Sequence, residues 1–219
     1  MKIFIVIPFY NERLHISGVV KQVSKHLLPI VLVDDGSTDG GPRLLNKKNI
    51  ILLQHRINIG KGAALKTGAE YAFRHGADAV IFMDGDGQHT SEDLDNFIDR
   101  LKQGDCDAVF GSRNFSYGVP LIRFIGNKVA SALISLLFGI YISDVICGFR
   151  AVTKKGYEKI KWVSSGYGVE TEMVIRTGRY NLRYTEVPVK TLYHNSVKGV
   201  TILDAFGILA EVIKWRLTL

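Results

Sequence analysis

The stretch Lys2-Ile-Phe-Ile-Val-Ile-Pro-Phe-Tyr-Asn-Glu12 indicates the fold class, because a short apolar run ends abruptly in polar residues. Residues 2–7 have the compact apolar pattern of a strand that is buried on both faces of a parallel sheet. Similar units follow. We predict strands at residues 30–34, 50–54, 79–83 and 107–111, and helices at residues 12–26, 60–75 and 91–103. This alternation predicts an α/β protein with a mostly parallel central sheet flanked by helices.

The second half of the chain is less regular. Here we predict helices at residues 121–138, 166–177 and 200–219, and strands at residues 148–153 and 182–187. The 219 residues suit a single domain, and the sequence contains no repeat or low-complexity tract. The longest apolar stretch, residues 130–142, is shorter than the ~20 residues that span a bilayer.

Composition restricts the partners. The net charge of +7 suits an anionic partner, which could be nucleotide phosphates, nucleic acid or an anionic lipid surface. We do not expect nucleic acid, because the basic residues form no patch interleaved with aromatic residues. Cys106 and Cys147 lie far apart without CxxC spacing, which argues against a zinc site or a disulfide framework and favours a reducing cytoplasm. The N-terminus has no signal-peptide cleavage pattern, and we interpret it as the first strand.

Three polar turns follow predicted strands. They comprise residues 8–12, residues 34–39 and residues 84–89, and each carries at least one carboxylate. The carboxyl ends of parallel strands share one edge of a sheet, where open α/β sheets bind their ligands. Asp and Gly are ordinary turn residues, so one such turn would carry little weight. Three on the same edge predict a ligand site.

The turn Asp84-Gly-Asp-Gly-Gln88 is the most specific of the three. Two carboxylates one residue apart on a glycine-flanked loop suit Mg²⁺ or Mn²⁺ shared with the phosphates of a substrate. It is not an EF-hand loop, because His89 and Asp95 stand where that loop needs Gly and Glu. A plain structural turn is the alternative interpretation.

Asn58-Ile-Gly-Lys-Gly62 resembles a phosphate loop only in part. It is not a Walker A motif, because His55 stands where the first glycine should be and Gly62 replaces Ser or Thr. It is not GxGxxG either, because Leu65 fills the last glycine position. A helix N-terminus with glycines and a lysine still receives anions, so Lys61 is a candidate substrate-binding residue. The alternative is a glycine-lined helix start that packs tightly on the sheet.

Six ordered motifs together carry a family resemblance. They are Ile-Pro-Phe-Tyr-Asn-Glu (7–12), Val-Asp-Asp-Gly-Ser-Thr-Asp-Gly (33–40), Asn-x-Gly-Lys-Gly (58–62), Met-Asp-Gly-Asp-Gly-Gln-His (83–89), Gly-Ser-Arg (111–113) and Asp-x-x-Cys-Gly-Phe-Arg (144–150). The sequence resembles the family 2 glycosyltransferases from residue 3 to about residue 190, and within them the polyprenol-phosphate (dolichol-phosphate) mannose or glucose synthases. The resemblance implies a single GT-A type catalytic domain over residues 1–199, followed by an apolar or amphipathic helix over residues 200–219.

The resemblance also implies how a nucleotide-sugar donor is held. The residues expected at the base and ribose are Pro8, Tyr10, Glu12 and Asp35. Asp84 is expected at the sugar or the ribose.

Phosphate and metal contacts follow from the same resemblance. Asp86 and Gln88 are expected to ligate Mg²⁺ or Mn²⁺ on the diphosphate. Arg113 is expected to neutralise phosphate charge with a fixed guanidinium fork, and Arg123 to contact an acceptor phosphate.

The expected reaction is attack on the anomeric carbon of the sugar, with departure of a nucleoside diphosphate whose growing charge the metal offsets. A polyprenyl-phosphate oxygen is already anionic and needs no general base, whereas a sugar hydroxyl needs one. The available carboxylates are Glu170 and Glu172. Two residues apart on a helix, they cannot share one face. We expect Glu172 to be the site residue, because a glutamate recurs at this position in the family.

The expected function is therefore metal-dependent, inverting transfer of a hexose from GDP-mannose or UDP-glucose to a polyprenyl phosphate. One alternative is transfer to a saccharide or surface-polymer hydroxyl. Another, of a different class, is a non-catalytic nucleotide-sugar-binding subunit. The basic charge and the apolar residues 200–219 favour a peripheral location on the anionic cytoplasmic face of a membrane. Residues 121–142 are either a core helix or a second contact with that surface.

Overall fold

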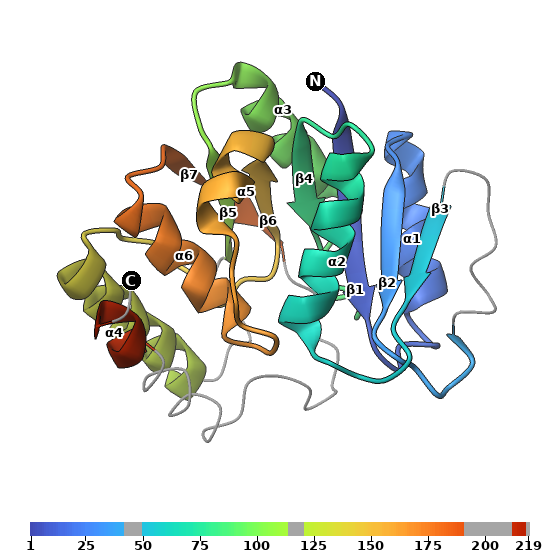
Figure 1. Cartoon of the computed structure of the whole chain (residues 1–219), viewed down its shortest axis with the longest axis horizontal. Helices are drawn as coiled ribbons and strands as arrows, with labels where there is room; N and C mark the ends of the chain where they lie inside the picture. Colours follow the sequence, from blue (N-terminus) through green and yellow to red (C-terminus); the bar gives the residue numbers. More distant parts are fainter. Residues whose placement is uncertain (42–49, 114–120, 191–211, 218–219) are drawn as a thin grey trace.

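Seven strands form one sheet in the computed structural model, in the order β3-β2-β1-β4-β6-β5-β7 (Figure 1). The strands are β1 (Ile3–Phe9), β2 (Ile30–Asp34), β3 (Ile50–Gln54), β4 (Ala79–Phe82), β5 (Ala108–Arg113), β6 (Arg150–Thr153) and β7 (Tyr184–Val189). The structure describes residues 1–41, 50–113, 121–190 and 212–217, and only the backbone of residues 121–124. The predicted α/β architecture is confirmed.

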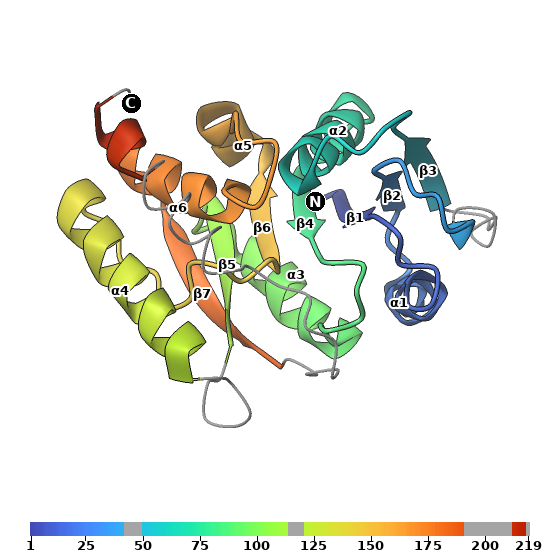
Figure 2. The ribbon, with the colours of Figure 1, turned by 90° about the horizontal axis from the view of Figure 1, so that it is seen from below.

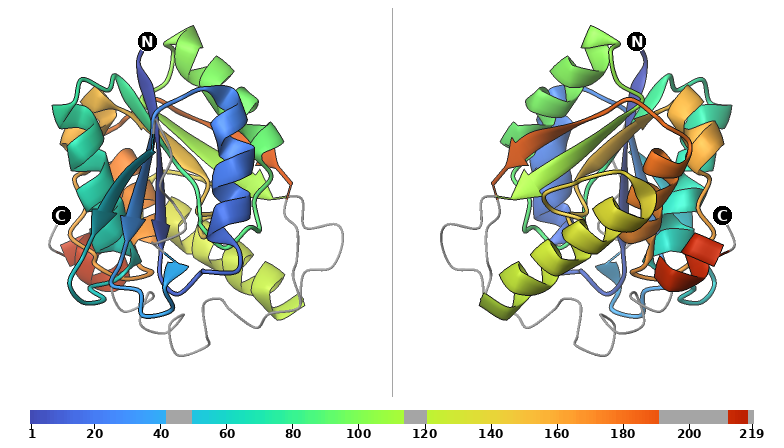
Figure 3. Two further views of the ribbon diagram at one scale, coloured as in Figure 1. Left: turned by 90° about the vertical axis from the view of Figure 1, so that its right-hand side faces the viewer. Right: turned by 90° about the vertical axis from the view of Figure 1, so that its left-hand side faces the viewer.

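Helices cover both faces of this sheet. They are α1 (Ile16–Val23), η1 (Ser24–His26), α2 (Lys61–Arg74), η3 (Ser91–Asp93), α3 (Leu94–Gln103), α4 (Leu121–Phe138), α5 (Lys154–Ile160) and α6 (Val169–Arg179). Figure 3 (left) shows the sheet between α1 on one side and α2 on the other.

The alternation of side chains along β1 explains this layering. Ile5 and Ile7 point to one face and join the core under α1 and α3. Phe4 and Val6 point to the opposite face and pack with α2, α5 and α6. A third cluster packs α4, α6 and residues 212–217 beside β5.

Six of the seven strands run in the same direction, and β6 runs antiparallel between β4 and β5. The amino end of β6 therefore lies at the edge where the other strands have their carboxyl ends. This orientation brings residues 144–149 next to the turn that follows β4. The prediction of a mostly parallel sheet is confirmed, but the sequence did not indicate which strand is reversed.

The first helix begins later than predicted, at Ile16 rather than at residue 12. Asn11 has a left-handed backbone (φ 54°), and its N–H donates to Ser37 Oγ at 2.9 Å. The N–H of Arg13 donates to Asp39 Oδ2 at 2.8 Å. These bonds tie residues 11–13 to the turn after β2, so this segment is not helical.

Other element boundaries also differ from the prediction. Helix α5 was not predicted, and it starts where Thr153 Oγ1 accepts a 3.1 Å bond from the N–H of Gly156. Helix α6 starts at Val169 rather than at residue 166. Of the helix predicted over residues 200–219, the structure describes residues 212–217, which are helical. Within the described residues, no helix has the length and apolar character needed to cross a membrane.

Candidate active site

The acidic turns meet at the carboxyl edge of the sheet, the lower edge in Figure 1 and the edge that faces the viewer in Figure 2. The strand order reverses direction between β1 and β4, so this is a topological switch point. The turn after β1 and the turn after β4 flank it. Glu12 lies close enough to Asp86 to oppose its ionisation. The predicted convergence of these two turns is therefore observed.

Lys61, the first residue of α2, lies between two carboxylates. Its Nζ is 2.6 Å from Asp84 Oδ1 and 2.6 Å from Glu170 Oε1. Burial disfavours the charge of Lys61, but the two carboxylates outweigh burial and raise the pKa of its ammonium above the ordinary value. Burial likewise acts to raise the pKa of Asp84, and Lys61 more than offsets this, with help from His89, so that the pKa is lowered. Asp84 is therefore ionised, and the ammonium of Lys61 offsets its negative charge.

Asp86 is in a different electrostatic situation. Burial, and then the negative charge of Asp84, raise its pKa. Its Oδ1 accepts a 2.9 Å bond from the N–H of Gln88, which shapes the turn. Asp86 is the carboxylate on this turn whose charge would gain most from a nearby cation. The donor set of Asp86 and Gln88, both oxygen-bearing, fits a hard divalent cation.

No group of three or more His, Cys, Asp and Glu side chains arranged to hold a metal occurs in the described part of the chain. A metal at Asp86 and Gln88 would thus share its remaining coordination positions with a substrate or water.

The 144–150 segment holds Asp84 and Arg113 in place. A Cβ on Gly148 would collide with the Asp84 carboxylate, so a larger residue at this position would displace Asp84. Arg113 donates to Asp144 from Nε at 2.6 Å and from Nη2 at 2.9 Å. Asp144 is fully buried, so this two-point pair fixes the guanidinium rigidly at the site.

Arg150 is a buried structural residue that the sequence-based site prediction did not include. Its Nε donates to the carbonyl of Cys147 at 2.7 Å, and its two Nη atoms donate to the carbonyls of Val145 and Glu170. It therefore joins the turn that carries Asp144 to the helix that carries Glu170. The sequence feature that could have identified Arg150 is its position as the last residue of the motif Cys-Gly-Phe-Arg.

His89 was also left out of the predicted site. It is buried, its Nε2 is 3.8 Å from Asp84 Oδ2, and its ring packs edge-on against Phe149 at 5.3 Å. Its Nδ1 has no hydrogen-bond partner among the residues that the structure describes. Burial lowers the pKa of His89.

Asp35, predicted to bind the nucleotide, is buried and already has three partners. Its Oδ1 is 2.7 Å from His55 Nδ1 and accepts the N–H of Ile59 at 3.1 Å, and its Oδ2 accepts the N–H of Gly60 at 2.8 Å. These bonds fix the chain just before Lys61. If Asp35 binds a nucleotide, it does so in addition to this structural role.

Glu170 and Glu172 point in different directions, as expected from their helical spacing. Glu170 reaches Lys61 at the site. Glu172, the residue expected there, instead accepts the N–H groups of Val163 and Ser164 at 2.8–3.1 Å and Arg176 Nε at 2.6 Å. The geometry therefore favours Glu170 over Glu172 as the carboxylate that faces the site.

The segment held by Glu172 packs against the start of α2. Trp162 Nε1 donates to the carbonyl of Gly62 at 2.8 Å, and the N–H of Ala63 donates to the carbonyl of Ser165 at 3.0 Å. Side chains at Gly60 and Gly62 would collide with residues 164 and 165. The tightly packed glycine helix start considered from the sequence is thus present, with Lys61 between the two glycines.

The remaining predicted residues lie around this centre. Pro8 is in β1 with its carbonyl against Gly85, and Tyr10 and Glu12 lie on the turn that follows. Arg123 is in α4, and its side chain falls outside the described residues.

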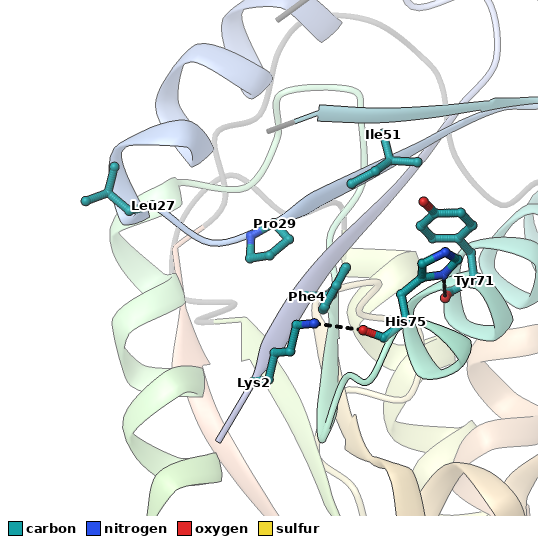
Figure 4. Close-up of a pocket in the computed structure, with 7 residues that line it drawn as sticks. All are labelled: Lys2, Phe4, Leu27, Pro29, Ile51, Tyr71 and His75. Carbon is teal, nitrogen blue, oxygen red and sulfur yellow. Dashed lines mark hydrogen bonds between the residues drawn. The ribbon is translucent and has the colours of Figure 1, made fainter. Parts of the chain in front are cut away.

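A separate hollow of about 470 Å³ lies at the opposite, amino edge of the strands (Figure 4). Its lining residues are Lys2, Phe4, Leu27, Pro29, Ile51, Tyr71 and His75. Lys2 Nζ donates to the carbonyl of His75 at 2.8 Å, and no carboxylate is among the described residues that line the hollow. It has none of the acidic chemistry of the carboxyl edge.

An open, mostly parallel sheet with acidic turns at its switch point defines the protein as an α/β protein with a candidate ligand site at that edge. A sequence model of glycosyl transferase family 2 matches residues 4–161, and the chain belongs to that family. It is a glycosyltransferase.

Relatives support the predicted group within the family. The chain is 30% identical to polyprenol monophosphomannose synthase of Mycolicibacterium smegmatis, over 94% of this chain and 85% of that protein. It is 29% identical to UDP-N-acetylglucosamine--dolichyl-phosphate N-acetylglucosaminyltransferase of Methanococcus voltae, over 98% and 96%. The resemblance to polyprenol-phosphate sugar transferases is confirmed.

A solved structure confirms the GT-A type fold. The chain superimposes on glucosyl-3-phosphoglycerate synthase from Mycobacterium tuberculosis, solved in complex with Mn²⁺, UDP and phosphoglyceric acid, with a TM-score of 0.77. The match covers 98% of this chain and 78% of that one at 18% identity.

Proposed function

We propose that this glycosyltransferase moves a hexose from a nucleotide sugar, GDP-mannose or UDP-glucose, to a polyprenyl phosphate with inversion at the anomeric carbon. One observation carries the proposal: Asp84 and Asp86 share a turn at the switch point, and of the two only Asp84 forms an ion pair with Lys61, which is partly buried. Relatives whose names specify polyprenol, dolichyl or undecaprenyl phosphate support the acceptor class.

Asp86 and Gln88 would hold Mg²⁺ or Mn²⁺ together with the donor diphosphate. The cation supplies charge that offsets the growing negative charge of the leaving nucleoside diphosphate. The raised pKa of Asp86 supports this assignment, because a bound cation would remove the cost of ionising a partly buried carboxylate next to Asp84.

The base and ribose of the donor would lie on the turn after β1, with Pro8, Tyr10 and Glu12. Asp35 would contribute from the turn after β2. Asp84 would face the ribose or the sugar, with its orientation set by Lys61. This assignment is supported by the location of both turns at the carboxyl edge.

The acceptor would approach from the side of Arg113. Its guanidinium is held rigidly by Asp144. Because the side chain is already ordered, binding a phosphate there costs little additional side-chain entropy. Arg123, on the helix that follows in sequence, would add a contact to the acceptor phosphate. An anionic phosphate oxygen attacks without a general base, which agrees with the pairing of Glu170 to Lys61 rather than to a polar acceptor.

A saccharide hydroxyl acceptor is the second candidate, and the position of Glu170 beside Asp84 favours it. For this acceptor Glu170 would have to serve as the general base and to leave Lys61. We further propose that the catalytic domain spans residues 1–199 and that residues 200–219 help it to associate with the cytoplasmic face of a membrane.

Calorimetric titration of GDP-mannose, UDP-glucose, GDP and UDP, with Mn²⁺ and after chelation, tests the donor site. We expect one nucleotide class to bind only with the metal, and Asp86→Ala to abolish that binding. Asp99→Ala, on the exposed side of α3, is the matched control. Transfer assays with polyprenyl phosphate follow. If no nucleotide binds under any condition, the proposed function is wrong.

The same transfer assays distinguish a phosphate acceptor from a hydroxyl acceptor. Glu170→Gln should abolish transfer to a hydroxyl acceptor, because that acceptor needs Glu170 as its general base. The same substitution should not abolish transfer to a phosphate acceptor, because a phosphate oxygen needs no general base. Nucleotide binding without transfer to either acceptor class would contradict both acceptor proposals.

A further inference from the structure

Asn11 has a backbone conformation that is uncommon for its place in the fold. Its φ is 54°, in the left-handed region that residues other than glycine seldom occupy. Two other described non-glycine residues have a positive φ, Leu27 at 56° and Asn181 at 49°. Leu27 ends η1 and Asn181 follows the end of α6, and helix ends are where a left-handed residue is common. Asn11 instead follows strand β1, at the edge that carries the candidate active site.

Asn11 forms two hydrogen bonds with the turn after β2. Its backbone N–H donates to Ser37 Oγ at 2.9 Å, and its side-chain Oδ1 accepts the N–H of Thr38 at 2.8 Å. Because β1 and β2 are paired in parallel, their turns leave the sheet side by side (Figure 1). Asn11 therefore joins the turn that follows β1 to the turn that follows β2.

Asparagine meets two requirements of this position at once. It adopts a left-handed φ more readily than most residues with a side chain, and its amide oxygen supplies the acceptor for the Thr38 N–H. Glycine would meet the first requirement alone, and alanine would meet neither. Aspartate would meet both, but it would add a negative charge next to Glu12.

The turn after β1 has to be held against electrostatic repulsion. After burial and Asp84, the negative charge of Glu12 also raises the pKa of Asp86, so these two carboxylates lie close enough to repel each other. The carbonyl of Glu12 accepts two N–H groups at the start of α1, both at 2.9 Å. Glu12 is thus held near Asp86 from both sides, by the bonds of Asn11 before it and by the start of α1 after it.

We infer that Asn11 is a positioning residue for the nucleotide donor. Its left-handed backbone and its two bonds set the turn after β1 against the turn after β2 before the donor binds. The contacts proposed for Tyr10 and Glu12 on one turn and for Asp35 on the other are then available together, without a rearrangement of either turn. The inference rests on the proposed function, since it assigns Asn11 to the same donor site.

Substitutions at residue 11 separate the backbone conformation from the side-chain bond. Asn11→Gly keeps the left-handed φ and loses the acceptor for Thr38, whereas Asn11→Ala loses both. The measured quantity is the Kd of GDP and of UDP, by calorimetry with Mn²⁺. We expect it to rise about fivefold in Asn11→Gly, the effect of one hydrogen bond, because the donor must then order the turn itself. In Asn11→Ala the unfavourable φ adds to this loss, and we expect a rise of about twentyfold.

Ser37→Ala tests the same link from the other turn. It removes the acceptor of the Asn11 N–H and leaves residue 11 unchanged. We expect the Kd to rise about fivefold here as well.

Asn181 provides the matched control, because it is the same residue type with nearly the same φ. It precedes β7 at the amino edge of the sheet, opposite the donor turns. Asn181→Ala should lower the Tm, as Asn11→Ala does, and it should leave the Kd unchanged. Circular dichroism and thermal unfolding of every variant confirm that each Kd refers to folded protein.

The possible results are distinct. An unchanged Kd in Asn11→Ala and Asn11→Gly with a lower Tm overturns the positioning role and leaves Asn11 a stability residue. An equal rise of the Kd in Asn181→Ala also overturns it, because lost stability alone would then explain the effect. If Asn11→Ala does not fold, Asn11→Gly and Ser37→Ala decide in the same way. An unmodified chain that binds neither GDP nor UDP refutes the proposed function, and this role with it, before any variant is compared.

Discussion

Glu172→Gln perturbs the segment that supports Lys61 without touching the site itself. Glu172 is fully buried and accepts bonds from Val163, Ser164 and Arg176. A neutral amide leaves the Arg176 guanidinium without its charged partner and turns a donor group toward other donors. Breaking a buried pair of this kind costs about 3 kcal/mol or somewhat more. Domains of this size lose about 2–4 °C of Tm per kcal/mol, so we expect a drop of roughly 6–12 °C with the fold retained.

The effect should reach the site through Trp162 and Gly62. When residues 163 and 164 lose their acceptor, Trp162 loses the packing that directs its Nε1–H to the carbonyl of Gly62, and the start of α2 shifts. Nucleotide affinity should then fall about tenfold or more, because Lys61 no longer orients Asp84 at its present 2.6 Å. Tryptophan emission should shift to longer wavelength as Trp162 becomes exposed. Glu158→Gln, exposed on α5, is the matched control.

The measurements are thermal unfolding, tryptophan emission and nucleotide calorimetry on the two variants. A lower Tm with unchanged emission and affinity would refute the positioning role and leave Glu172 as a stability residue. Normal emission and affinity with lost transfer would instead support the sequence-based expectation that Glu172 acts in the chemistry.

Three further predictions concern the site. Asp86→Asn should raise the Tm of the metal-free protein at neutral pH, because an acid whose pKa is raised on folding destabilises the fold above its unfolded pKa; Mn²⁺ should raise the Tm of the unmodified chain and not that of the variant. Gly148→Ala should cost about 1–3 kcal/mol in urea unfolding and weaken nucleotide binding, since its Cβ displaces Asp84, whereas Gly126→Ala meets no atom and should be neutral or slightly stabilising. Asp144→Asn should cost about 3 kcal/mol in urea unfolding and lower phosphate affinity, because Arg113 loses its buried partner. An Asp86→Asn protein that Mn²⁺ still stabilises, a Gly148→Ala protein as stable as Gly126→Ala, or unchanged phosphate affinity in Asp144→Asn would contradict the respective prediction.

The apolar runs were sufficient to predict the parallel sheet, because buried parallel strands require continuous apolar residues. The apolar runs carried no information on the direction in which each strand runs. Residues 150–153 have the same pattern whichever way the strand runs, so the reversal of β6 could not be predicted. That reversal places Gly148 against Asp84, and the contact was therefore equally invisible in the sequence.

The choice between Glu170 and Glu172 shows a second limit. Helical spacing correctly separated the two side chains onto different faces, but spacing does not say which face meets the site. The answer depends on the segment over residues 161–168, whose N–H groups need an acceptor and find it in Glu172. The demand of these backbone donors for partners decided the outcome, and it depends on tertiary structure.

The same demand explains why the number of acids at the edge overstates the number available to a ligand. Asp34 accepts the N–H of Ser37, Asp35 accepts those of Ile59 and Gly60, and Asp39 accepts those of Arg13 and Gly41. These carboxylates hold the turns in place because each one accepts hydrogen bonds from backbone N–H groups of the turns. Asp84 is paired with Lys61. Asp86 differs from all of them, since burial and a neighbouring acid oppose its charge and one backbone N–H is the hydrogen-bond donor that it has among the described residues. An unfavourable charge kept at a switch point is reasonable if a cation and a diphosphate bind there, which is why Asp86 is the residue whose substitution tests the site most directly.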